Sequence, residues 1–281
     1  MLAKRVIPIH VWGGYGSQLF ALALYFKLIA IHPNKSFKFI FHTSGVTKRT
    51  LQIESHLRNV PFSIVDDFIL NIPNSSFEKS TFTFTFLKSK LRPFLEFLGF
   101  ISNANNESSL LKLKPWLIAI RGHYSQIRIT SEILDQIFQT QKSDFEDGIA
   151  LHLRLGDLLT IHQKNPIKPE LITAVINEVR FSKCVNTLHI YSDSTNAITT
   201  YLPLLKNYQI IKNELDIESQ IIRMARYEYF VGTNSKISLW VALIRCLNLN
   251  DNLSSFLPKE LKIAIESNLR SDLVQKVHFY G

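Results

Sequence analysis

The stretch Gly148–Asp157, with the sequence GIALHLRLGD, decides the fold of the second half of the chain. Its odd-numbered positions from 149 to 155 are apolar, whereas positions 152 and 154 hold a histidine and an arginine. This period of two predicts a β-strand with one face in a core. Gly156 ends the strand and lets the backbone pass close to a ligand. The same pattern also fits an ordinary strand whose Arg154 and Asp157 pair on a solvent-exposed face.

The position of the arginine favours a binding function. In α/β proteins, ligands bind beyond the carboxyl ends of the strands. The planar guanidinium of Arg154 matches phosphate oxygens through two parallel hydrogen bonds. We therefore expect an anion to bind where this strand ends.

Strands and helices alternate on both sides of this stretch. Before it, the pattern predicts strands at 5–11, 37–42, 62–70 and 116–120, and helices at 19–30, at 47–58 and from 127 to 138. After it, the pattern predicts strands at 187–191, 209–211 and 229–231, and helices at 169–180, 195–204, 216–226 and 236–246. Repeated βα units predict parallel sheets with helices on both faces. We expect an α/β fold of two such domains that face each other across a cleft, namely 1–146 and 147–281.

Composition narrows the class of protein. The chain has 281 residues, 46% of them hydrophobic, which is enough for two domains of about 100–200 residues each. Its net charge of +9 favours an anionic partner, such as a nucleotide, an acidic lipid surface or a nucleic acid. The chain has two cysteines, Cys184 and Cys246, which make neither a disulfide framework nor a metal site. We therefore expect the protein to work in the reducing cytoplasm. The longest apolar stretch, 19–31, contains Lys27 and is too short to span a bilayer, so contact with a membrane would be peripheral.

The segment 71–110 has two interpretations. It is rich in Ser, Thr, Asn and Phe, and the alternation of Phe82, Phe84 and Phe86 fits a strand, although a mobile insertion fits equally well. If its apolar residues are exposed among nearby basic residues, the segment would touch a membrane or a lipid-linked substrate. The alternative, a buried amphipathic segment, is favoured because apolar stripes usually face a core.

Clusters of polar residues and glycines follow the strands at 13–18, 121–126, 152–157, 191–194 and 232–238. Because parallel strands end at one edge of each sheet, these clusters can converge. The first cluster joins a strand to a helix, which either directs backbone N–H groups toward an anion or simply makes a tight turn. The sequence contains no D-x-D triplet, no P-loop and no G-x-S-x-G, and its histidines lack the spacing of a metal site. A metal-free site built from an arginine and backbone amides suits the departure of a phosphate.

The order of these clusters resembles the α-1,2-fucosyltransferase family, glycosyltransferase family eleven. The motifs of that family are G-G-x-G-N-Q, G-Y-x-Q-S, H-x-R-R-G-D, S-D-D and N-S-x-F-S-W-W. The corresponding segments here are Gly13–Phe20 (GGYGSQLF), Gly122–Gln126 (GHYSQ), His152–Asp157 (HLRLGD), Tyr191–Asp193 (YSD) and Gly232–Trp240 (GTNSKISLW). This chain departs from the pattern at Ser17, Leu155, Ser194 and Leu239, which replace Asn, the second Arg, the second Asp and the first Trp.

The resemblance implies a GT-B fold of two Rossmann-like domains, with the acceptor mainly in the N-terminal domain and the nucleotide sugar in the C-terminal one. It also implies an inverting, metal-independent transfer of fucose from GDP-fucose to a sugar hydroxyl. It implies no cofactor other than the donor substrate. The expected acceptor is an oligosaccharide or lipid-linked glycan of a bacterial surface polysaccharide, such as an O-antigen unit of lipopolysaccharide. The expected location is the cytoplasm, with peripheral contact on the inner face of the bacterial membrane. A GT-B transferase that uses another nucleotide sugar remains an alternative, as does a non-enzymatic binder of anionic partners, although no nucleic-acid-binding signature is present.

The resemblance also implies roles for individual residues. Arg154 would bind the diphosphate and neutralise the leaving group, with His152 and Asp157 beside it as the other catalytic residues. The expected donor-binding residues are Gly14, Gly16, Ser17, Gln18, Asp193, Gly232, Asn234, Ser235 and Ser238. The expected acceptor residues are His123, Tyr124 and Gln126. The catalytic base is not identified; Asp66, Asp67 and His123 are candidates, and a structural role is favoured for the histidine.

Overall fold

We describe the fold from a computed structural model. It describes residues 6–43, 49–66, 92–104, 108–122, 124–138, 145–155, 168–183, 185, 187–194, 209–212, 216–248 and 253–281. The strand expected near 82–86, the helix expected at 195–204, and Cys184 lie outside these ranges. In the part of the chain that is described, no helix combines the length and the apolar character needed to cross a membrane.

The contacts divide the chain into two compact units, Met1–Arg128 and Ile129–Gly281. The expected boundary between residues 146 and 147 is therefore too late. The reason is helix α5, Ser131–Phe138, which belongs to the second unit. The ring of Phe138 packs edge-on against Trp240 at 5.7 Å, and the backbone N–H of Ile129 donates to Asn268 O.

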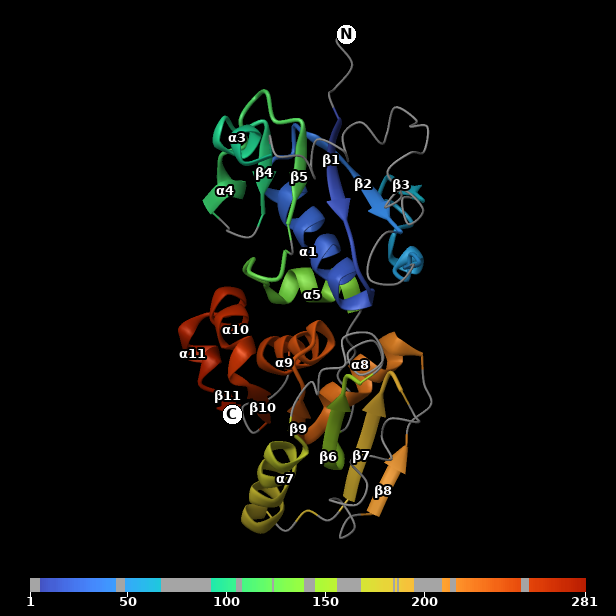
Figure 1. The fold of residues 1–281 in the computed structure, drawn as a ribbon, viewed down its shortest axis with the longest axis vertical. Helices are drawn as coiled ribbons and strands as arrows, with labels where there is room; N and C mark the ends of the chain where they lie inside the picture. Colours follow the sequence, from blue (N-terminus) through green and yellow to red (C-terminus); the bar gives the residue numbers. More distant parts are fainter. Residues whose placement is uncertain are drawn as a thin grey trace. The chain divides into compact units, whose positions relative to one another are not determined.

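The first unit is built on a five-stranded parallel sheet in the order β3-β2-β1-β5-β4 (Figure 1). Its strands are β1 Val6–Val11, β2 Ser36–His42, β3 Phe62–Val65, β4 Ile101–Asn103 and β5 Ala119–Arg121. The predicted strands at 5–11 and 37–42 are confirmed. The third is shorter than predicted because it ends before Asp66, and β5 begins later than predicted.

Helix α1, Tyr15–Ile31, begins four residues before the predicted start. Gly14 is its N-cap, so the glycine turn is short and the next glycine already belongs to the helix. Gly13 has a φ of 95°, a left-handed conformation that favours glycine. The predicted helix at 47–58 is wrong over its described part, where only the 3₁₀ turn Glu54–His56 forms. The short helices α3, Arg92–Phe97, and α4, Ser108–Leu111, flank β4.

The second unit contains a six-stranded parallel sheet in the order β11-β10-β9-β6-β7-β8. Its strands are β6 Glu146–Leu153, β7 Thr187–Ser192, β8 Gln209–Lys212, β9 Tyr227–Gly232, β10 Ser254–Pro258 and β11 Val277–Tyr280. Its helices are α7 Pro169–Lys183, α8 Ile217–Arg226, α9 Lys236–Asn248, α10 Lys262–Asn268 and α11 Ser271–Val274, with a 3₁₀ turn at Lys259–Leu261. The strands and helices predicted over the described part of 148–248 are confirmed, including Asp216 as the N-cap of α8.

The two faces of β6 are covered by different helices. Ile149, Leu151 and Leu153 lie in one apolar cluster with residues of α7. Helices α8 and α9 pack on the opposite face, and His152 is directed toward α9. The period of two in the sequence therefore correctly predicts two distinct faces. The second face is also buried and not exposed to solvent, since His152 is only 6% exposed.

A buried arginine holds the amino-terminal ends of two strands together. Arg245 on α9 is 1% exposed, and its guanidinium uses each of its five N–H donors. The acceptors are Ala225 O, Tyr227 O, Glu228 O, Ser254 O and Ser255 Oγ. One side chain thus ties the end of α8 to the starts of β9 and β10.

We predict that Arg245→Met strongly destabilises the protein. The substitution leaves several buried carbonyl groups without a donor, each at a cost of about 1–3 kcal/mol, so the free energy of unfolding should fall by about 3 kcal/mol or more. The measurement is urea unfolding followed by circular dichroism. Arg270→Met is the matched control, because this arginine is exposed and pairs with nearby Asp272, so its loss should change stability by less than about 1 kcal/mol. Equal midpoints for Arg245→Met and wild type would contradict the assignment.

Candidate anion-binding site

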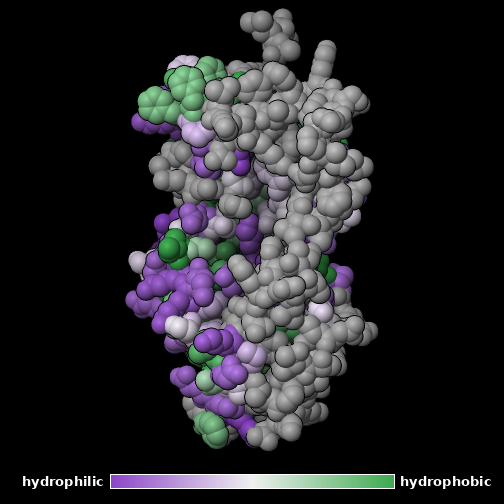
Figure 2. Space-filling view, viewed as in Figure 1, coloured by the Kyte–Doolittle hydropathy of each residue, from purple (hydrophilic) through white to green (hydrophobic). Residues whose placement is uncertain are grey.

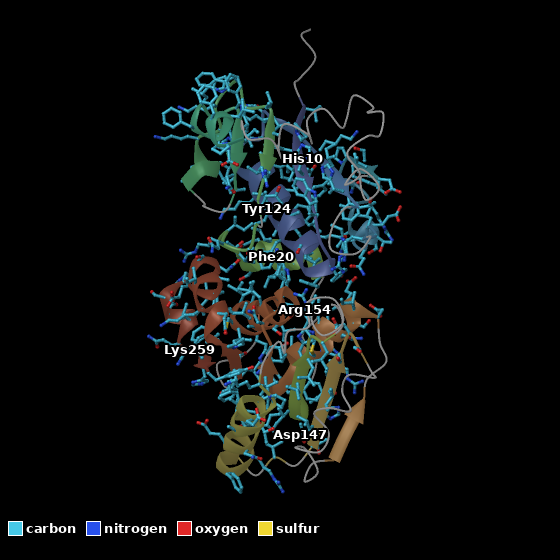
Figure 3. All side chains as sticks on the ribbon, in the orientation of Figure 1. His10, Phe20, Tyr124, Asp147, Arg154 and Lys259 are labelled. Carbon is cyan, nitrogen blue, oxygen red and sulfur yellow. The ribbon has the colours of Figure 1, made fainter. Side chains whose placement is uncertain are left out.

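Three strand ends of the second unit meet at the carboxyl edge of its sheet. In the strand register, His152 of β6 lies opposite Tyr191 of β7 and Gly232 of β9. The residues that follow these strands therefore start from neighbouring positions. Figure 3 shows Arg154 beyond the end of β6, whereas Asp147 marks the other end of the strand. The predicted convergence of 152–155, 191–194 and 232–238 is thus confirmed for these described residues.

A buried hydrogen-bond network joins β6 to the start of α9. The Nδ1 atom of His152 lies 2.7 Å from Ser238 Oγ and 3.4 Å from Ser235 Oγ. Ser235 precedes α9 and accepts a hydrogen bond from the backbone N–H of Ser238, which is the pattern of a helix N-cap. His152 therefore holds the helix start in place, and its imidazole is not exposed to a ligand.

Two further hydrogen bonds fix the backbone around Arg154. Its N–H donates to Thr233 Oγ1 at 3.1 Å, and the N–H of Leu155 donates to Asp193 Oδ1 at 2.7 Å. One carboxylate oxygen of Asp193 thus organises the strand end, while the residue itself stays exposed. The predicted nucleotide contact by Asp193 remains a prediction.

The close approach of α9 to the sheet depends on a glycine. A Cβ atom at Gly232 would lie 2.7 Å from Ser238 Cβ and 2.7 Å from Leu257 Cδ2, which is too close for any side chain. The Gly232 carbonyl accepts a hydrogen bond from Tyr280 Oη at 2.7 Å. Gly232 and Ser238 therefore build the site without being exposed ligand contacts, whereas Asn234 lies exposed in the turn between them.

The electrostatics of this edge favour an anion. Lys236, the first residue of α9, has a pKa lowered to about 8, mainly by burial and further by the charge of Arg154. Two cations are therefore close enough to interact at the amino terminus of a helix, where the helix dipole is also positive. Burial lowers the pKa of His152 to about 4, so it is neutral at pH 7 and adds no charge. Lys236 was missed by the sequence analysis, although it lies inside the last motif.

The glycine turn of the first unit is stabilised by hydrogen bonds from a buried side chain. Gln18 is fully buried, and its Nε2 donates to Gly13 O at 3.0 Å and to Thr50 O at 2.9 Å, while its Oε1 accepts from the N–H of Gln52. Its amide is therefore used to join the turn to the segment 50–52, and a direct donor contact by this side chain is not supported. Gly14 and Ser17 are partly exposed, whereas Gly16 is buried.

The expected acceptor residues have different environments. Tyr124 is buried, its φ is 58°, and its hydroxyl donates to His10 O (both residues are labelled in Figure 3). This placement makes it a structural residue of the strand end and corrects its assignment to the acceptor. Gln126 is exposed, as a binding residue must be. Four other residues singled out in the sequence lie outside the described residues, namely His123, Gly156, Asp157 and Asp67. Asp66 accepts a hydrogen bond from Thr43 Oγ1 at 2.7 Å.

An aromatic cluster at the carboxyl edge of the first sheet was also missed. His10 Nδ1 and His42 Nε2 lie 2.8 Å apart, and the ring of Trp12 stacks on His42 at 4.5 Å. The Arg121 guanidinium lies 5.8 Å from the centre of the Trp12 ring. The signal in the sequence is the alternation of His10 and Trp12 at the end of β1.

Within the described ranges, no group of three or more His, Cys, Asp or Glu side chains could hold a metal ion.

We predict that protonation of His152 destabilises the fold. The pKa is about 4 in the folded protein against 6.5 for an ordinary histidine, so between these values the unfolded chain binds a proton that the folded chain does not. The free energy of unfolding should therefore decrease as the pH falls from 6.5 toward 4, by up to about 1.4 kcal/mol per pH unit. Nearby Arg154 and Asp193 change this pKa in opposite directions, and burial is the larger cause.

The measurement compares urea unfolding at pH 7 and pH 5 for wild type and His152→Asn. The asparagine cannot take up the proton, so its stability should depend less on pH. The control is His278→Asn at an exposed position, which should keep the wild-type slope. Equal slopes for wild type and His152→Asn would contradict the prediction.

No protein-family profile matches this sequence, and no curated protein is detectably similar to it in sequence. Its fold is similar to that of the E. coli heptosyltransferase WaaC with ADP, with 10% identity, a TM-score of 0.52, and coverage of 98% of this chain and 92% of that one. The fucosyltransferase NodZ from Bradyrhizobium has 12% identity and a TM-score of 0.49, with coverage of 85% and 92%. The chain therefore has the α/β fold of GT-B glycosyltransferases, with one parallel sheet in each unit.

Proposed function

We propose that the chain is a glycosyltransferase that moves a sugar from a nucleoside-diphosphate sugar to a hydroxyl group of a glycan. The observation that carries this proposal is that Arg154, beyond the end of β6, and Lys236, the first residue of α9, lie at one strand–helix junction. Hydrogen bonds from Arg154 N–H to Thr233 Oγ1 and between His152 and Ser238 hold this junction together. Two interacting cations and the N–H groups of a helix start form a site for a multiply charged anion. The GT-B fold makes a nucleotide diphosphate the natural choice among such anions.

In the proposed reaction, the acceptor oxygen attacks the anomeric carbon as the bond from that carbon to the diphosphate oxygen breaks. The electron pair of the broken bond leaves with the diphosphate, and the hydroxyl proton passes to a base that is not identified. Attack from the face opposite the leaving group inverts the anomeric carbon. Arg154 stabilises the charge that develops on the diphosphate, a role that fixed cations perform without a metal ion.

The finer proposal is that the donor is GDP-fucose and that the product is an α-1,2 linkage on a glycan of a bacterial surface polysaccharide such as O-antigen. It is supported by the order of the sequence motifs around Gln18, Gln126, Arg154, Asp193 and Ser235. A GT-B transferase with another nucleotide sugar is the second candidate, favoured by the four departures from the motif pattern. We place the proposed activity in the cytoplasm.

We predict that Arg154→Ala weakens GDP binding by about 10- to 100-fold, because hydrogen bonds to charged groups contribute about 1.5–3 kcal/mol each. The measurement is titration calorimetry with GDP in EDTA, supported by thermal shifts with GDP-fucose, UDP, ADP and CDP. Arg270→Ala is the matched control, since this exposed arginine lies in the same unit and outside the site. The affinity of Arg270→Ala for GDP should equal that of the wild-type protein. In a transfer assay, Arg154→Ala should lose about 100- to 1,000-fold in rate.

Other outcomes separate the candidates. If the protein binds UDP, ADP or CDP but does not bind GDP, the transferase proposal stands and GDP-fucose is excluded as the donor. Binding of no nucleotide by the wild-type protein would exclude the transferase. Oligonucleotide binding with a steep salt dependence would then support a non-enzymatic binder of anions.

We also propose peripheral contact of the first unit with an anionic membrane, which would suit a lipid-linked acceptor. The contact surface is an aromatic–lysine patch formed by Phe94, Phe97, Leu98, Lys114 and Trp116. Phe97 is 86% exposed, and Trp116 is 45% exposed with its Nε1 donating to Leu98 O at 3.0 Å. The Lys114 ammonium lies 5.7 Å from the Trp116 ring centre. Figure 2 shows hydrophobic residues gathered on the surface where Figure 1 draws α3.

This combination fits a bilayer surface. Exposed Trp and Phe side chains insert at the level of the lipid headgroups, and lysines attract anionic lipids. The net charge of +9 adds a general attraction to such a surface. The apolar and basic groups lie together, as a peripheral membrane contact requires.

We predict that Phe97→Glu weakens binding to phosphatidylglycerol vesicles about 10- to 100-fold, since burial of a phenylalanine contributes about 1.5–3 kcal/mol. The measurement is vesicle co-sedimentation. Phe181→Glu is the matched control, because Phe181 is 81% exposed on α7 of the other unit. Equal binding by both variants, or no binding by wild type, would exclude the patch as a membrane contact.

A further inference from the structure

Lys236 occupies a defined place in the network that builds the anion site. It is the first residue of α9 and lies between Ser235 and Ser238, which both contact His152 at the end of β6. The backbone N–H of Arg154 is bound to Thr233, three residues before Lys236. The two cations are thus attached to the same junction between strand and helix, one from each side.

The environment of Lys236 favours a multiply charged ligand. Burial lowers the pKa of the Lys236 ammonium group, and the charge of Arg154 lowers it further, so the two like charges act on one another at this junction. The positive end of the α9 dipole acts in the same direction. A diphosphate between the two cations would convert the repulsion into attraction.

The position of Leu155 explains why the second cation comes from α9. The resemblance in the sequence has a second arginine at this position, but Leu155 is completely buried in the apolar cluster between the sheet and α7. An arginine there would place its charge in a hydrophobic core, which is strongly unfavourable. Lys236 begins α9, the helix that His152 contacts from the opposite face of β6, and it is only partly buried.

We propose that Lys236 is a second diphosphate-binding residue, which acts with Arg154 and takes the place of the arginine that Leu155 replaces. This inference rests on the proposed function, because the diphosphate belongs to the nucleotide-sugar donor. The ammonium would bind diphosphate oxygens in the donor and in the leaving group. Its contribution is independent of the nucleobase.

The test uses the full chain with Lys236→Met, Lys236→Arg and the control Lys262→Met, whose lysine is exposed and pairs with Glu266. Titration calorimetry measures the affinity for GDP and for inorganic pyrophosphate, which reports on the phosphate site alone. Lys236→Met should weaken both about 10- to 100-fold, because a charged hydrogen bond is lost. Lys236→Arg should stay within about threefold of wild type, and Lys262→Met should bind both ligands as wild type does.

A second readout separates ligand binding from a structural role. Because the charged form is disfavoured in the ligand-free protein, Lys236→Met should raise the melting temperature without ligand while it weakens binding. A lysine that served only to support the fold would give a lower melting temperature when replaced. Unchanged affinity of Lys236→Met, with loss of GDP binding in Arg154→Ala, would overturn this inference and leave the proposed function intact. No nucleotide binding by wild type would overturn both.

Discussion

The hydrogen bond between His152 and Ser238 is the constraint on which the site depends. It joins the end of a central strand to the first turn of a buried helix, and burial lowers the pKa of the imidazole so that it is neutral at pH 7. Gly232 allows this contact, because any side chain there would push the helix away from the sheet. The positions of Arg154 and Lys236 follow from this junction, since each lies within two residues of one of its partners. The site is thus set by backbone geometry and buried polar groups, and the charged side chains are added to a frame that is already fixed.

The same junction brings together positively charged groups. Arg154 and Lys236 lie at the positive end of the α9 dipole, and burial together with the charge of Arg154 lowers the pKa of Lys236. Functional sites commonly hold such unfavourable arrangements, because the stability of the surrounding fold offsets them. In this chain the surrounding fold is the continuous apolar cluster of β6, β7, β9 and α7.

Sequence patterns predicted the fold best where local signals and packing agree. The strand at 146–153 was recognisable because its period of two matches two different helical layers, and α8 because Asp216 caps it. The strands β10 and β11 were missed because both are short and β10 contains serine and proline, so their pairing in the sheet is decided by tertiary contacts. The site was predictable as a set of strand ends, including Arg154 and Ser235. The inward directions of Gln18 and Tyr124 were not, because only packing decides which side of a turn a polar side chain takes.

The buried guanidinium of Arg245 has a consequence for how this fold can change over evolution or by engineering. It fastens the starts of β9 and β10, at the edge of the sheet opposite the strand ends that form the site. The structural anchor and the segments of the candidate site are therefore carried by opposite ends of the same strands. Substitution of the exposed Asn234 leaves both this anchor and the buried contacts of Thr233 and Ser235 untouched, so the surface of the candidate site can be altered while the sheet keeps its register.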